Sequence, residues 1–118
     1  MSAKIITDYG KITISDNAVA IIAAISAMET YGVVGMAAKN ATDGIFELLS
    51  FKNLSKGIKV TSEETFVNID IHIIIQYGIN IAVVSENLIE KVRFNVEKQT
   101  GLEVRDVNLF VQGIRTNK

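Results

Sequence analysis

Apolar and polar residues alternate with a period of two in several stretches of the chain, which is typical of strands that bury one face. The clearest case is residues 65–76, where β-branched side chains occupy every second position: Val67, Ile69, Ile71, Ile73 and Ile75. Shorter runs predict strands at residues 4–7, 11–14, 33–36, 58–61 and 102–112. In the last of these the apolar phase shifts between Val104 and Val107, which indicates a bulge at Arg105-Asp106.

Three other stretches repeat apolar residues at helical spacing, at residues 18–28, 45–54 and 80–99. Gly101 follows the last of them, where a left-handed helix terminator is expected. The predicted order is therefore β-β-α-β-α-β-β-α-β. This order predicts the α+β class: a single two-layer domain over residues 1–118, with helices packed on a mixed sheet.

The helix predicted over residues 18–28 has no charged side chain and is apolar almost all round. One side carries a stripe that we expect to face the domain's own sheet: Ala18, Ile21, Ile22, Ile25 and Met28. A surface helix normally exposes a charged face, so the opposite, alanine-rich side needs a second cover. Either the helix at residues 45–54 or another protein chain provides it. The candidate interface on this side is formed by Val19, Ala20, Ala23, Ala24 and Ala27.

Composition narrows the functional classes. The 118 residues are 48% hydrophobic and 21% charged, with a formal net charge of −1 and no cysteine. A nucleic-acid-binding protein normally carries a clustered excess of basic residues, which this chain lacks. We therefore expect no nucleic acid as a partner. The longest apolar run, residues 18–25, is far shorter than the ~20 residues that span a bilayer. The N-terminus lacks the layout of a signal peptide, so we expect a cytoplasmic protein without a membrane span.

Chemistry-bearing residues are sparse. His72 is the only histidine, and Asp70 lies on the same strand face, two residues away. The pair is a candidate polar site, but a polar sheet face that meets solvent or a partner is the simpler explanation. One histidine cannot supply a zinc site, and the glycines form no dinucleotide or phosphate-binding motif. We therefore predict no catalytic, cofactor or metal site, and the residues alone do not indicate a function.

Five segments occur in a recognisable order along nearly the whole chain. They are YGKITIS (residues 9–15), YGVVGM (31–36), YG (77–78), TGLEV (100–104) and VNLFVQGI (107–114). Together they resemble the alkaline-shock-protein, or envelope stress response, family of Gram-positive bacteria, and its shorter YloU-like branch in particular.

The resemblance implies a role in cell-envelope homeostasis and no catalytic residues. It also implies links to fatty-acid metabolism, a membrane-anchored partner that holds the protein at the membrane, and a fatty-acid-kinase-like partner. Our first hypothesis is a non-enzymatic, cytoplasmic homo-oligomer that acts through protein contacts in envelope stress response and lipid homeostasis. The alternative is a module that binds an acyl chain or lipid precursor between the apolar helix and the sheet.

Overall fold

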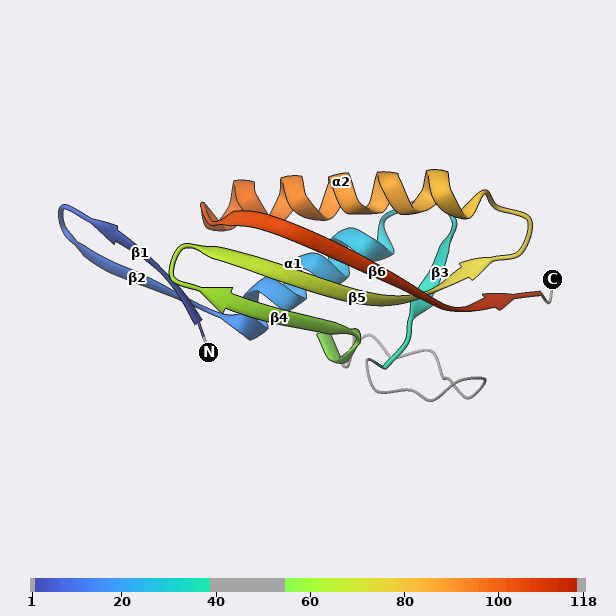
Figure 1. Cartoon of the computed structure of the whole chain (residues 1–118), viewed down its shortest axis with the longest axis horizontal. Helices are drawn as coiled ribbons and strands as arrows, with labels where there is room; N and C mark the ends of the chain where they lie inside the picture. The colour runs from blue at the N-terminus through green and yellow to red at the C-terminus, as the bar shows by residue number, and fades with distance from the viewer. Residues whose placement is uncertain (1, 39–54, 117–118) are drawn as a thin grey trace.

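The computed structural model describes residues 2–38 and 55–116 of the chain (Figure 1). Its elements are β1 (Ser2–Thr7), β2 (Gly10–Ser15), α1 (Asp16–Met28), β3 (Val33–Met36), β4 (Ile58–Glu63), β5 (Phe66–Gln76), α2 (Ile81–Thr100) and β6 (Glu103–Arg115). The α+β class and the predicted order of these elements are confirmed. The helix predicted at residues 45–54 lies outside the described residues.

The main sheet is built around β5. Strands β3 and β4 pair with it in antiparallel fashion along one edge, and β6 pairs with it in parallel along the other edge. The sheet is therefore mixed, as predicted. Strands β1 and β2 form a separate antiparallel hairpin.

Strand β6 contains two bulges. Val67 pairs with Val104 and Asn68 pairs with Asp106, so Arg105 is the extra residue of the first bulge, close to where the apolar phase shift predicted it. A second shift leaves Gln112 extra, because Ile73 pairs with Val111 and Ile74 pairs with Gly113. We did not predict the second bulge, and β6 continues past the predicted end at residue 112.

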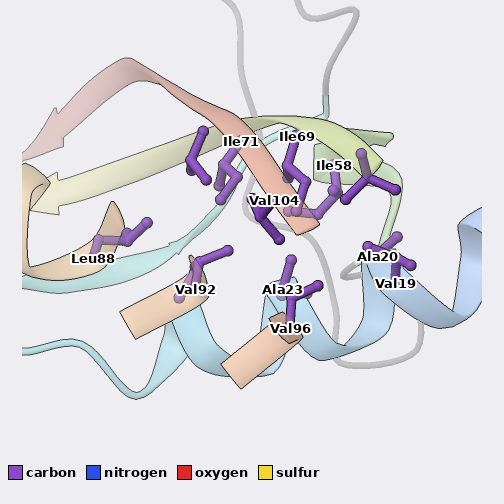
Figure 2. Close-up of a cluster of buried hydrophobic side chains, with 14 of the residues drawn as sticks. Val19, Ala20, Ala23, Ile58, Ile69, Ile71, Leu88, Val92, Val96 and Val104 are labelled. Atoms are coloured by element: carbon purple, nitrogen blue, oxygen red, sulfur yellow. The ribbon is translucent and has the colours of Figure 1, made fainter. Parts of the chain in front are cut away.

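The core lies on one face of the sheet, which α1 and α2 cover side by side (Figure 2). The alternating residues of β5 all point into it and have no exposed surface: Val67, Ile69, Ile71, Ile73 and Ile75. Helix α2 contributes one buried residue per turn: Val84, Leu88, Val92 and Val96. The buried face of β5 therefore packs against the apolar stripe of α2, and the sequence shows both patterns.

Helix α1 presents the opposite side to the core from the one we predicted. The alanine-rich side is buried and the isoleucine stripe is largely exposed. Small side chains allow the axis of α1 to approach both β4 and α2 closely, whereas isoleucines on that side would hold the helix away. Our assignment of the stripe to the domain's own sheet was wrong.

Caps at the helix ends explain where the helices begin and stop. The Ser15 hydroxyl accepts a hydrogen bond from the backbone N–H of Ala18 at 3.1 Å and begins α1. The Asn80 side chain accepts one from Val83 at 3.1 Å and begins α2. Gly101 adopts φ of 78° and ends α2, as the sequence predicted.

The β1–β2 hairpin extends beyond the sheet and lengthens the molecule to 54 Å against 25 and 20 Å in the other directions (Figure 1). It joins the body near its base, where Ala3 is buried and the Lys4 N–H donates to the Glu64 carbonyl at 2.8 Å. Its far end carries the exposed side chains of Ile6 and Tyr9. Only the base of the hairpin is therefore anchored in the core.

Candidate interaction surfaces

The outward side of α1 is an apolar surface on the described chain. Ile21, Ile25 and Met28 are 44%, 43% and 36% exposed, and they follow one another at intervals of four and three residues. They therefore form one continuous ridge, which we call the outer stripe. No charged residue lies between Asp16 at the start of α1 and Glu29 just beyond its end. The outer stripe has the composition of a contact surface rather than that of a solvated helix face.

Two contacts with α2 hold α1 in this orientation. The Asn95 amide donates to the Ser26 hydroxyl at 2.8 Å, and that hydroxyl donates to the Ile22 carbonyl at 2.8 Å. Ser26 is therefore buried with both hydrogen-bonding roles of its hydroxyl used. At the end of α1, the Lys91 ammonium lies 3.5 Å from the Glu29 carboxylate. The only polar side chain within the apolar run thus faces α2, which directs the outer stripe to solvent.

The interface that we predicted from sequence is buried within the chain. Its five residues are at most 6% exposed and belong to the core cluster: Val19, Ala20, Ala23, Ala24 and Ala27. Figure 2 shows Ala23 facing core side chains of the sheet, with Val92 and Val96 of α2 beside it. The free face of α1 is the outer stripe, and the alanine side cannot meet a partner in the folded chain.

Asp70 and His72 lie on the face of β5 opposite to the helices, as the alternation predicted. Their contacts differ, however. The Asp70 carboxylate accepts a hydrogen bond from the Asn108 amide at 3.0 Å. The Nδ1 atom of His72 lies 3.3 Å from the Gly57 carbonyl, and its ring stacks on Phe110 with 4.8 Å between centroids. Each side chain therefore has its own structural partner on a neighbouring segment.

These contacts make His72 a packing residue. Replacement by alanine removes the stacking and the contact with Gly57, so we expect His72→Ala to lower the free energy of unfolding by about 1–3 kcal/mol. Asp70→Ala should cost less, about 0.5–1.5 kcal/mol, because its one bond is exposed. Urea denaturation of both variants measures the difference. Equal stability of His72→Ala and the wild type would show that the stack contributes nothing.

Other kinds of site gain no support from the described part of the chain. Within residues 2–38 and 55–116, no three histidine or acidic side chains lie close enough together to hold a metal ion. Neither α1 nor α2 has the length and apolar content needed to cross a membrane. An open hollow of about 740 Å³ lies between the hairpin and the β4–β5 turn, lined in part by Lys4, Glu63 and Glu64. Ile5 and Ile6 also line it, so its lining is mixed, and it is a shallow, open hollow rather than an enclosed cavity.

The space between α1 and the sheet is the place that we predicted for a bound acyl chain. In the described residues this space is filled by core side chains, among them Ala23, Ile69 and Val104 (Figure 2). The alanine side packs directly on the strands, and burial at this level leaves no surface for a ligand. The structure therefore gives the ligand-binding alternative no supporting feature at this position.

Comparison with known proteins gives a consistent result. The family model of alkaline shock protein 23, described as having a cell envelope-related function, matches residues 4–116. The uncharacterized protein YloU of Bacillus subtilis is 42% identical over 98% of this chain and 97% of its own length. An uncharacterized protein of Streptococcus pyogenes is 41% identical over 98% of this chain and 96% of its own. The uncharacterized protein YqhY of Bacillus subtilis is 30% identical over 92% of this chain and 80% of its own length. No solved structure matches significantly.

Proposed function

Because the chain belongs to the alkaline shock protein 23 family, whose function is related to the cell envelope, we propose that it is a non-enzymatic accessory protein of the envelope. It acts through contacts with other proteins and through self-association. A protein partner brings it to the membrane from the cytoplasm. The processes that it serves are the envelope stress response and fatty-acid and lipid homeostasis.

The outer stripe of α1 is the observation that carries this proposal. Three neighbouring apolar side chains, Ile21, Ile25 and Met28, remain substantially exposed on a helix whose other sides are covered. Full burial of such a side chain stabilises by about 1.5–3 kcal/mol. About 40% of each of the three remains to be covered, so a partner on the outer stripe would gain about 2–4 kcal/mol before the cost of association. An amphipathic helix or an apolar groove of another protein fits a ridge with this spacing.

The sheet face with Asp70 and His72 supports the non-enzymatic part of the proposal. A general base has to reach a proton of a bound substrate, so its side chain has to be open to that substrate. Here the His72 ring is covered by Phe110, its Nδ1 faces the Gly57 carbonyl, and the side chain is buried. Asp70 contacts Asn108 rather than orienting the imidazole through Nδ1.

Photo-crosslinking in the living cell tests docking through the outer stripe. A benzoylphenylalanine at position 25 should capture a partner protein on irradiation, and the same probe at Glu90, an exposed position of α2, should not. Adding Ile21→Glu to the probe at position 25 should reduce the adduct at least fivefold, because it places a charge in the same ridge. An adduct that forms equally at positions 25 and 90 would contradict specific docking on α1.

A further inference from the structure

Strand β6 forms an edge of the main sheet over its whole length of 13 residues. It pairs with β5 on one side, and no other described strand pairs with its other side. Figure 1 shows it running along the border of the sheet beneath α2. An edge strand of this length presents a row of unpaired backbone groups, which proteins normally protect.

Helix α2 protects one end of this edge. The Arg93 guanidinium donates hydrogen bonds to the carbonyls of Val104 and, at 3.1 Å, of Arg105. The Glu97 carboxylate accepts one from the Val104 N–H at 2.9 Å. These two side chains bind backbone groups around the first bulge that would otherwise be free to pair with another strand. Beyond the bulge, no side chain of the described residues does the same.

The direction of the remaining backbone groups follows from the strand geometry. Successive residues of a strand direct their N–H and C=O groups to opposite edges. The Asp106 N–H points toward β5, because it donates to the Asn68 side chain at 3.1 Å. The groups of Val107, Leu109 and Val111 therefore point away from β5, to the free edge.

The free part of the edge also lacks the usual protection by charge. Residues 107–114 contain no charged side chain. Phe110 and Ile114 are 45% and 43% exposed, and Leu109 and Val111 are half-buried. A long, uncharged and apolar edge favours pairing with another strand.

The sequence of β6 is complementary to itself in one antiparallel register, centred on Leu109. This register places Val107 opposite Val111, and Glu103 opposite Arg115, of a second copy. The apolar residues of the core face then meet one another, Phe110 lies opposite Asn108 on the other face, and opposite charges meet at both ends. The two bulges lie at residues 104–106 and 111–113. In this register residues 104–106 lie opposite residues 112–114 of the second copy, so the two bulges overlap. A register centred on Phe110 would instead place Arg105 opposite Arg115, with like charges.

We propose that β6 pairs with β6 of a second copy in this antiparallel register, which joins the two main sheets into one. The inference rests on the self-association of the proposed function and names its surface. The central pairs at residues 107, 109 and 111 would form about six backbone hydrogen bonds across the two-fold axis. Arg93 and Glu97 of each copy occupy backbone groups of Val104 and Arg105, so the backbone pairing ends there and Glu103 meets Arg115 of the other copy through side chains alone.

Cysteine crosslinking of the full chain tests the register, and the absence of native cysteines makes each introduced thiol unique. Glu103→Cys and Arg115→Cys each alter a solvent-exposed side chain. When the two variants are mixed and mildly oxidised, we expect a disulfide-linked dimer, because the register places these two positions opposite each other just beyond the paired backbone. Each variant alone should give at least fivefold less. Leu109→Cys, on the two-fold axis, should crosslink with itself.

The possible outcomes distinguish failure of the β6 interface from failure of self-association itself. A wild type that sediments as a dimer, with no crosslink in the mixture or in Leu109→Cys, would overturn the β6 interface alone. A wild type that stays monomeric up to about 100 μM would contradict self-association itself. A charge swap adds a test without cysteine: Arg115→Glu should weaken the dimer about tenfold, and Glu103→Arg in the same chain should restore it. Failure of the second change to restore it would contradict the pairing of these two positions.

Discussion

Ala24→Glu should unfold the protein, whereas Ile25→Glu, one position further along α1, should leave it folded. Ala24 is 1% exposed and lies in the core cluster, so a glutamate there would bury a charge without a partner and overfill the packing. We expect a loss of at least about 5 kcal/mol, which reaches the lower end of the ~5–15 kcal/mol that stabilises a domain. Circular dichroism and urea denaturation measure the effect.

Ile25→Glu is the matched control for this prediction. The same glutamate is introduced at a side chain that is 43% exposed, so its carboxylate reaches water. The expected loss is about 1 kcal/mol or less. Equal stability of the two variants, both well folded, would mean that the alanine side of α1 is accessible. The prediction from sequence, an interface on that side, would then stand after all.

Gly32→Ala should lower the free energy of unfolding by about 2–4 kcal/mol, the second largest effect that we expect. Gly32 links α1 to β3 with φ of 95°, a conformation that costs an L-residue about 1–2 kcal/mol. An added Cβ would also lie 2.9 Å from a methyl carbon of Val84 and 3.1 Å from one of Ile79. Both neighbours are side chains that pack around the start of α2.

Gly78→Ala separates the backbone cost from the steric cost. Gly78 has φ of 90°, close to that of Gly32, but an added Cβ would meet no atom within 4 Å. We therefore expect a loss of only about 1–2 kcal/mol for Gly78→Ala. Urea midpoints of the two variants compare them directly. If Gly32→Ala is no less stable than Gly78→Ala, the close contact with Val84 does not constrain the turn.

The sequence predicted those features that depend on one strongly periodic segment. The β-branched alternation from Val67 to Ile75 determined both the position of β5 and the face that it buries. Gly101 and the phase shift at Arg105 are local signals, and both were correct because a helix end and a bulge depend on nearby residues. The second bulge, at Gln112, left a similar phase shift between Val111 and Ile114 that we did not use.

The orientation of α1 could not be predicted from its own residues. When both sides of a helix are apolar, hydrophobicity does not say which side is buried. The decision came from geometry: α1 has to lie close to β4 and α2 at once, and small side chains permit this. The Ser26 hydroxyl was a usable signal, since a buried polar group needs a partner, but Asn95 lies 69 positions away. The contacts of His72 with Gly57 and Phe110 are equally non-local.

Complementation of the envelope phenotype of a deletion strain tests docking through the outer stripe most directly. Ile21→Glu with Ile25→Glu should fail to complement, although immunoblotting and circular dichroism find the variant present and folded. Asp70→Ala with His72→Ala should complement like the wild type at equal protein level. Full complementation by the variant of Ile21 and Ile25, with loss of function in a variant of Asp70 and His72 that circular dichroism finds folded, would contradict action through contacts of α1 and indicate chemistry on the sheet face.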